Sequence, residues 1–534
     1  MAIELSNLTF TDQDDIVPGS GEEQIVNTGV ANTLAGNDTI IGTGTQDSAF
    51  EEGIFNEGTL NTDDGKDIII GTGNLIGIFN LGTLNTGDGN DEITGIQTQD
   101  FYFDAYGIIV RGIIDTGDGD DIITGIVTGS VTRPVLKSAG DGIYVNSSSL
   151  NTGNGNDTIT GYGDGVGINV NRFGSLDTGK GNDIITGTGG FNGISNYTFL
   201  NTGDGDDTII GNGPSGISNN GTFNTGDGND IINGNGDGGN SGLYNNSTID
   251  TGDGNDIING IGTGTDDYAL LSFGTMDTGA GNDEINGTNA NGWGIFNGGI
   301  IDTGDGNDKI TGTGSYGMDN NGIINTGKGN DSLTSRGSFY NTGVVFLGEG
   351  NDSITADTED FFISAIENLN AIDTGDGDDT ITSTGVIYNE SVINTGNGND
   401  SIIVDGGIDG ITGTAYGIIF NDGGAINMGD GNDSIIASEG FKSGPNSSGA
   451  WFLGEGEDYI KGFGSGDFYG GNGNDTLELT PGTYTVGIWG EGGESPIFTK
   501  GDQLMITSEF EKLKAGSTIY DFTSLTAGQI IVVA

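Results

Sequence analysis

The chain has 534 residues, of which 108 are glycine and none is cysteine or histidine, and its formal net charge is -63. The missing cysteine and histidine exclude disulfides, thiolate chemistry and the usual ligands of zinc and copper. The acidic charge makes nucleic acid and anionic membrane poor partners and demands cations, and the remaining oxygen ligands suit calcium or magnesium.

The first thirty residues carry no repeat. Ile3, Leu5, Leu8 and Phe10 predict one or two strands, and we interpret residues 1–30 as an N-terminal cap that covers the first coil of a repeat array. The segment has neither the basic nor the apolar region of a cleaved signal peptide, so none is expected. No stretch of the sequence has the apolar length of a membrane span.

Residues 31–478 form an array of repeats about 26 residues long, built around Thr-Gly-Asp-Gly-Asn-Asp-x-Ile. The motif is intact at 225–232, 251–258 and 303–310. Eighteen copies align on their last Asp, with Gly two residues before it and Ile or Leu two residues after it. These residues are Asp38, Asp67, Asp91, Asp121, Asp157, Asp183, Asp207, Asp230, Asp256, Asp283, Asp308, Asp331, Asp352, Asp379, Asp400, Asp433, Asp458 and Asp475.

Each repeat contains three short apolar segments separated by Gly or Asn. The first includes Ile54, Ile78, Ile194, Ile217, Leu243 and Ile295. The second includes Leu60, Leu84, Ile114, Leu150, Leu176, Leu200, Phe223, Ile249, Ile301 and Ile324. The third is the Ile or Leu after the aligned Asp. Helices are disfavoured because each interior Gly costs about 1 kcal/mol, whereas Ile and Thr favour strands. The pattern predicts an all-β parallel β-helix, or β-solenoid, of about 18 coils with three short strands per coil and small β caps at both ends.

Two further features follow from the alignment, a column of Asn residues and a set of insertions. Asn occupies one repeat position at Asn56, Asn80, Asn196, Asn219, Asn245, Asn297 and Asn320, which predicts a stacked amide ladder. Insertions follow the third segment at 97–106, 126–140, 404–416 and 438–449. Insertions at one repeat position map to one face of a solenoid, which is either an interaction face or a place where loops vary freely.

The repeated loop concentrates carboxylates, amides and backbone carbonyls in a tight turn. Calcium takes 6–8 oxygen ligands, and two stacked loops could supply them through a carboxylate from each aligned Asp and several turn carbonyls. The Gly two residues before the Asp would turn its carbonyl toward the ion. The alternative is that these loops are Asx and Gly turns with solvated carboxylates, but an unneutralised Asp column at the ~4.8 Å strand spacing would repel itself.

These loops resemble the RTX, or hemolysin-type, calcium-binding repeat, Gly-Gly-x-Gly-x-Asp-x-apolar-x. Residues 470–478 match every defined position, and most other copies carry Thr in place of the first Gly. The resemblance implies that the eighteen aligned Asp residues bind multiple Ca²⁺ ions, with turn carbonyls as further ligands. RTX rolls have a nine-residue period with two loops per turn, so the longer period here predicts calcium along one edge. We expect weaker sites at Asp38, which follows Leu34 and Ala35, and at Asp67, which follows Asp63 and Lys66. We also expect lower local affinity beside Lys180 and Lys328.

The resemblance also implies folding coupled to calcium and export by type I secretion. Residues 479–534 have their own strand-like segments, and we interpret them as a C-terminal β cap that carries the secretion signal. The expected location is extracellular or at the cell surface.

Three functions remain open at this stage. The first is a structural protein, not an enzyme, that self-associates into a fibre, matrix or surface layer. The second is a calcium-stabilised adhesin that binds a cell-surface polysaccharide, or an ice-binding solenoid. Its binding surface would be either the face with the insertions or a Thr column (Thr86, Thr116, Thr152, Thr178 and Thr202). The third is a polysaccharide lyase or epimerase, for which the scattered candidates are Arg111, Arg133, Lys137, Tyr144, Tyr162 and Arg172.

Overall fold

The computed structural model describes residues 2–18, 23–44, 52–100, 104–129, 140–265, 267–358, 364–406, 417–443, 449–490 and 495–534. These residues form strands, turns and two single-turn 3-10 helices, η1 (Leu5–Asn7) and η2 (Phe522–Ser524). Within them, no helix is long and apolar enough to cross a membrane. The predicted all-β parallel β-solenoid is confirmed, with about 17 turns.

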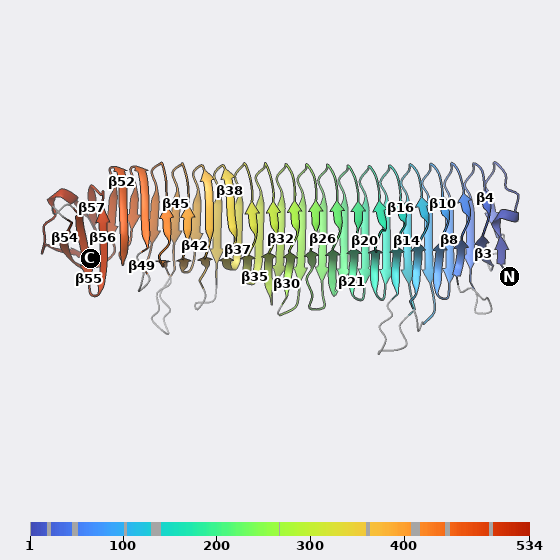
Figure 1. Cartoon of the computed structure of the whole chain (residues 1–534), viewed down its shortest axis with the longest axis horizontal. Helices are drawn as coiled ribbons and strands as arrows, with labels where there is room; N and C mark the ends of the chain where they lie inside the picture. Colours follow the sequence, from blue (N-terminus) through green and yellow to red (C-terminus); the bar gives the residue numbers. More distant parts are fainter. Residues whose placement is uncertain are drawn as a thin grey trace. The chain divides into compact units, whose positions relative to one another are not determined.

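The chain divides into two compact units, one of Met1–Ala280 with Ile285–Gly292 and the other of Gly281–Glu284 with Trp293–Ala534. Three parallel sheets recur in each unit, and we number them by the three apolar segments of the repeat. Strands of the second sheet lead into the acidic turn, Thr-Gly-Asp-Gly-Asn-Asp, and strands of the third sheet leave it. Within each unit, successive coils lie side by side along the chain (Figure 1).

In the first unit, the first sheet consists of β1 (Ala2–Glu4), β3 (Gln24–Asn27), β6 (Glu52–Asn56), β9 (Ile76–Asn80), β12 (Tyr106–Val110), β15 (Asp141–Val145), β18 (Val166–Val170), β21 (Asn192–Asn196), β24 (Ser215–Asn219), β27 (Leu243–Asn245) and β30 (Tyr268–Ser272). The second consists of β4 (Val30–Asn32), β7 (Thr59–Asn61), β10 (Thr83–Asn85), β13 (Ile113–Asp115), β16 (Ser149–Asn151), β19 (Ser175–Asp177), β22 (Phe199–Asn201), β25 (Thr222–Asn224), β28 (Thr248–Asp250) and β31 (Thr275–Asp277). The third consists of β2 (Ile16–Val17), β5 (Thr39–Thr43), β8 (Ile68–Gly73), β11 (Glu92–Gln97), β14 (Ile122–Val127), β17 (Thr158–Gly163), β20 (Ile184–Gly189), β23 (Thr208–Gly213), β26 (Ile231–Gly236), β29 (Ile257–Gly262) and most of β32 (Glu284–Asn289).

In the second unit, two long strands, β35 (Lys309–Asn320) and β37 (Ser332–Asn341), run through the third sheet into the first. The first sheet also contains β33 (Trp293–Asn297), β40 (Ile366–Asn368), β43 (Ile387–Asn389), β46 (Ile418–Asn421) and β49 (Gly440–Ser443). The second contains β34 (Ile300–Asp302), β36 (Ile323–Asn325), β38 (Val344–Glu349), β41 (Ala371–Asp376), β44 (Val392–Asn394), β47 (Ala425–Asn427), β50 (Ala450–Gly456), β52 (Gly466–Gly473) and β56 (Gln503–Ser508). The third also contains β39 (Ser353–Asp357), β42 (Thr380–Ser383), β45 (Ser401–Val404), β48 (Ser434–Ala437), β51 (Tyr459–Lys461), β53 (Thr476–Leu479) and β57 (Lys512–Ala515).

The core consists of the apolar columns that the repeat predicts. Leu84 pairs in register with Leu60 on one side and Ile114 on the other, and all three side chains are fully buried. The Ile column of the third sheet is buried in the same way, as at Ile69, Ile93 and Ile123. A single coil would leave these side chains in water, so each coil depends on its neighbours for its core.

The predicted amide ladder is confirmed at the end of the first-sheet strands. The Asn56 side chain donates to Asn80 Oδ1 at 2.7 Å, and Asn219 donates to Asn245 Oδ1 at 2.9 Å. In the second unit, the ladder runs on through Asn341, Asn368, Asn389 and Asn421. Valine takes the same position at Val110, Val145 and Val170, where the first unit replaces the ladder with apolar packing.

Both ends of the stack extend past the residues with the repeat. At the N-terminal end, β1 pairs with β3 and β2 pairs with β5, so residues within 1–30 already contribute strands to the sheets. At the C-terminal end, β56 and β57 add one parallel strand each to the second and third sheets. Antiparallel pairs then follow, formed by β54 (Gly482–Trp489), β55 (Ser495–Lys500), β58 (Thr518–Asp521) and β59 (Ile530–Val533).

The insertions do not all lie at one corner. Those at 97–106, 126–140 and 404–416 connect a third-sheet strand to the next first-sheet strand, as predicted. The one at 438–449 contains β49, a first-sheet strand, so its extra length falls one corner later. Residues 101–103, 130–139, 407–416 and 444–448 lie outside the described residues.

Glycine in the acidic turns permits close stacking. A Cβ on Gly117 would lie 2.0 Å from the Gly87 carbonyl oxygen, and one on Gly119 would lie 1.5 Å from the Gly89 oxygen. The carbonyls therefore point at the glycine of the next coil, which gives this glycine a stacking role that the sequence did not predict. Leu34 and Asp63 hold the first of these positions with φ of 68° and 57°, a left-handed backbone that is costly for both.

We expect opposite effects from exchanges at this one repeat position. Gly117→Ala should lower the free energy of unfolding by about 2 kcal/mol or more, because the methyl group forces two coils apart. Leu34→Gly should leave stability unchanged or raise it by up to about 1 kcal/mol, because the left-handed backbone is no longer strained. Thermal and denaturant unfolding followed by circular dichroism would measure both, and equal losses in the two variants would contradict the stacking argument.

Candidate metal site

The eighteen predicted Asp residues all lie at the same corner of the coil, between the second and third sheets. Each ends an acidic turn and precedes a third-sheet strand, and each is at most 2% exposed. Within each unit they form one internal column. The apolar residue two positions later explains this placement, because alternation along the strand points both side chains inward.

Within each unit, a hydrogen-bond ladder joins successive aligned Asp residues through one carboxylate oxygen. The Asp67 N–H donates to Asp91 Oδ1 and the Asp91 N–H donates to Asp121 Oδ1, both at 2.8 Å. The same bond recurs from Asp38 to Asp256 in the first unit and from Asp283 to Asp475 in the second, at 2.7–2.9 Å. Each carboxylate therefore binds the backbone of the coil before it.

Two residues that the sequence analysis missed end this ladder. The Asp15 N–H donates to Asp38 Oδ1 at 2.8 Å, and the Asp475 N–H donates to Glu511 Oε2 at 2.8 Å. Neither lies in a copy of the repeat, so the alignment gave no signal for them. Glu511 stands where a further Asp would be expected, and it satisfies the last N–H of the column.

A second ladder runs along the outside of the same turns, through the residue before each aligned Asp. Here the N–H of one coil donates to the side chain of the coil before it, as from Asn156 to Asp120 Oδ1 and from Asn229 to Asp206 Oδ1, both at 2.8 Å. The inner and outer ladders run in opposite directions, so each turn is bonded through Asx side chains to both of its neighbours. The Asn of the motif thus has a structural role that its sequence position did not reveal.

The other carboxylate oxygen, Oδ2, is buried along the column. Among the described residues it has no hydrogen-bond partner at Asp38, Asp67, Asp91, Asp121, Asp157, Asp183, Asp207, Asp230, Asp308, Asp331, Asp352, Asp379, Asp400, Asp433, Asp458 and Asp475. A buried charged oxygen without a partner costs several kcal/mol unless a proton or a cation neutralises it. The repeat of this feature at successive coils distinguishes it from an isolated defect.

Burial is the main cause of the pKa shifts of the aligned Asp residues. It raises the pKa of Asp67, Asp121 and Asp183 to about 7 and that of Asp230 to about 8, although hydrogen bonds from the turn oppose the shift. In the second unit, burial likewise raises the pKa of Asp308, Asp352 and Asp433 to about 7. The pKa values of the outer carboxylates shift in the opposite direction, because hydrogen bonds from the next coil lower the pKa of Asp120, Asp206 and Asp378.

The Thr column lies inside the solenoid. Thr86, Thr116, Thr152, Thr178 and Thr202 are fully buried, so the expectation that this column could present a flat ice-binding array is wrong. The Thr86 hydroxyl can donate to the Asp91 carboxylate, which helps to hold the pKa of Asp91 down, or to the Thr116 carbonyl oxygen 3.3 Å away. One hydroxyl proton serves one of these acceptors at a time, so Thr does not neutralise the column.

The donor set fits a hard cation. The column supplies buried carboxylate oxygens beside turns rich in backbone carbonyls, and it contains no nitrogen or sulfur side chain that would favour zinc or copper. The carboxylates are arranged in a line, and nowhere in the described part of the chain do three acidic side chains converge on one point. An ion between two coils would therefore take carboxylate oxygens from two Asp residues and the remaining ligands from carbonyls or water. Lys180 points away from the column and pairs with the exposed Asp204.

The candidates for a catalytic site lie scattered over the first unit, and two of them have other partners. Arg111 lies over the Phe79 ring at 5.7 Å. Tyr144 packs against Tyr106 and accepts a hydrogen bond from Asn171. Tyr162 belongs to β17 in the third sheet, and Arg172 lies in a turn before the second sheet. The remaining candidates, Arg133 and Lys137, lie outside the described residues.

Comparisons with known proteins add little to this geometry. No protein-family model matches the chain, and no curated protein does. Among solved structures, the chain is similar to a hyperactive, Ca²⁺-dependent, β-helical antifreeze protein from an Antarctic bacterium, with 19% sequence identity, coverage of 82% of this chain and 83% of that chain, and a TM-score of 0.29. The fold and the site therefore rest on the chain's own geometry, and the RTX resemblance stays a prediction.

The raised pKa values predict an unusual pH dependence for the metal-free protein. An Asp whose pKa is higher in the folded state than in the unfolded state stabilises the fold below its unfolded pKa, near 3.8, and loses that contribution as pH rises toward 7. In metal-free buffer, the free energy of unfolding should therefore fall steadily between pH 4 and pH 8. Denaturant titrations at fixed ionic strength would measure this slope, and a rise in stability over that range would contradict a protonated column.

Proposed function

We propose that this chain is an extracellular, calcium-binding structural protein whose solenoid is completed by Ca²⁺ along the buried Asp column. The observation that carries the proposal is the series of buried Oδ2 atoms that have no hydrogen-bond partner among the described residues. Two carboxylates at the ~4.8 Å strand spacing repel each other by about 3 kcal/mol at an effective dielectric constant near 20. A divalent cation between them turns this repulsion into attraction, and it also reduces the net charge of -63.

Calcium suits these turns better than magnesium does. Calcium accepts irregular geometries with many oxygen ligands, whereas magnesium requires near-ideal octahedral sites and retains water. Because the turns of an unfolded chain are not stacked, a site between two coils exists only after folding, so the binding free energy stabilises the folded state. The chain would then stay unfolded in a low-calcium cytoplasm and fold in a calcium-rich exterior. This order of events agrees with the proposed type I secretion.

We further propose that the protein is not an enzyme and that it assembles with itself into a fibre, matrix or surface layer. Almost the whole chain is repeat, and two of the candidates for catalysis have structural partners, Arg111 at the Phe79 ring and Tyr144 at Asn171. Parallel solenoids present backbone edges at both ends, and pairing of such edges generates filaments. An assay on uronate polymers that showed cleavage or epimerisation would contradict the non-catalytic role.

Calcium should convert the chain from disorder to β-structure at near-neutral pH, because it neutralises the column. Circular dichroism during titration with CaCl₂ would follow the transition, and the same titration with MgCl₂ at equal ionic strength is the control. We expect multiple ions per chain by equilibrium dialysis. Equal folding in calcium and in a chelator would refute the calcium-binding column.

A matched pair of substitutions in one turn tests the position of the ions. Asp207→Asn removes a charge from the buried column and should release one or two bound ions and lower the melting temperature in calcium, because Asp207 borders two gaps between coils. Without calcium the same change should increase the β-structure that circular dichroism detects at pH 7, because it removes a buried charge. Asp206→Asn, the same exchange one residue earlier on the exposed ladder, should change neither result.

Assembly should follow folding. Electron microscopy and light scattering of the calcium-loaded protein should show fibres or sheets that grow with protein concentration and disappear in a chelator. A folded, calcium-loaded protein that stays monomeric at all concentrations would rule out the structural assembly while leaving the calcium site intact.

A further inference from the structure

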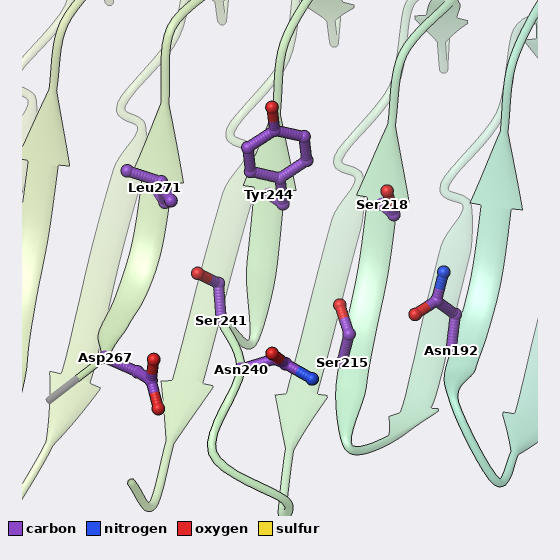
Figure 2. A pocket seen from close by; sticks show the side chains of 8 residues that line it. All are labelled: Asn192, Ser215, Ser218, Asn240, Ser241, Tyr244, Asp267 and Leu271. Atoms are coloured by element: carbon purple, nitrogen blue, oxygen red, sulfur yellow. The ribbon is translucent and has the colours of Figure 1, made fainter. Parts of the chain in front are cut away.

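A shallow groove lies on the outer surface of the first sheet, within the first unit. It has a volume of about 380 Å³ and is lined by Asn192, Ser215, Ser218, Asn240, Ser241, Tyr244, Asp267 and Leu271. Figure 2 shows Tyr244 and Leu271 at its upper edge and the polar side chains below and beside them. The groove is separate from the Asp column, which lies inside the corner between the other two sheets.

The groove exists because small residues interrupt a column of large ones. The outward position of the first-sheet strands holds Phe55, Phe79, Ile109 and Tyr144 in earlier coils. The same position then holds the smaller polar residues Asn169, Ser195 and Ser218 before large side chains return. The loss of large side chains from these adjacent strands leaves a polar surface, where Ser218 lines the groove while Ser195 is buried.

The walls come from the next two coils. Tyr244 and Leu271 follow Ser218 in register on β27 and β30. The Tyr244 ring is half-buried and packs edge-on against Phe273, with ring centroids 6.3 Å apart. The turn at 237–241, between β26 and β27, adds Asn240 and Ser241 on the lower side.

The lining has the chemistry of a site for neutral, hydroxyl-rich ligands. Its amides and hydroxyls each donate and accept hydrogen bonds, which matches sugar hydroxyls that do the same. Tyr244 offers an aromatic face and a polar tip, a combination that suits the mixed apolar and polar faces of a sugar ring. The lining includes no cationic side chain and one carboxylate, Asp267, in a chain of net charge -63, which opposes anionic ligands.

We propose that this groove binds an uncharged oligosaccharide segment, with Tyr244 stacking on a sugar ring and Asn192, Asn240 and Asp267 bonding its hydroxyls. The oligosaccharide would be a second ligand of the chain, in addition to calcium. It does not depend on the Asp column, because all of its residues lie on the outer surface of one sheet and the loops beside it.

Isothermal titration of the full, folded chain in calcium buffer tests the site directly. The probes are neutral gluco-, manno- and galacto-hexasaccharides, with a hexa-uronate as the charged comparison. We expect one neutral class to bind, Tyr244→Ala to weaken that binding at least tenfold, and Tyr162→Ala, an exposed tyrosine of the third sheet, to leave it unchanged.

A second variant fills the groove without touching the core. Ser218→Tyr places at this position the side chain that the next coil already carries at Tyr244, so folding should be unaffected and sugar binding should be lost. Circular dichroism in calcium confirms that each variant is folded, which separates failure of the groove from failure of the calcium proposal. Three results would overturn the inference: no neutral hexasaccharide binds at about 10 mM, which is roughly the weakest affinity of interest, Ser218→Tyr binds as well as wild type, or the uronate binds best.

Discussion

The constraint on which this protein depends is a line of buried carboxylates repeated at every coil. The strand spacing brings neighbouring Asp side chains to ~4.8 Å, where like charges in a protein interior repel strongly. One oxygen of each carboxylate fixes the backbone of the adjacent coil through a hydrogen bond of 2.7–2.9 Å. The column therefore aligns the coils and also creates a charge that a cation or a proton must neutralise.

Much of the remaining repeat serves to keep this column in register. The glycines of the acidic turn allow carbonyl groups of one coil to contact the backbone of the next, where a Cβ would collide. The outer Asx ladder bonds each turn in the direction opposite to the inner one. The Ile and Leu columns bury apolar surface that no coil could bury alone. Stability is thus a property of neighbouring coils, and a local defect weakens two interfaces at once.

The outward positions of the strands are free of these constraints. Side chains there do not enter the core or the ladders, so they vary from coil to coil between aromatic, aliphatic and small polar residues. The groove beside Tyr244 arises from this freedom, because smaller polar residues at three successive coils, Asn169, Ser195 and Ser218, leave a polar depression on an otherwise regular sheet. The inward-facing positions of the repeat thus stay regular, while the outward-facing positions vary and can form a specific binding surface.

The repeat pattern by itself determined the β-solenoid, its three strands per coil, the buried apolar columns, the Asn ladder and the alignment of the eighteen Asp residues. These follow from sequence because stacking at a fixed period places equivalent positions directly over one another. The tertiary structure decided which side of the turn each residue faces. The Thr column lies inside the solenoid, and the glycines allow the turns to stack closely. The insertion at 438–449 lies one corner later than predicted, and Glu511 ends the Asp ladder. These features depend on the path of the backbone through the turn and on residues far apart in sequence, which a periodic alignment does not contain.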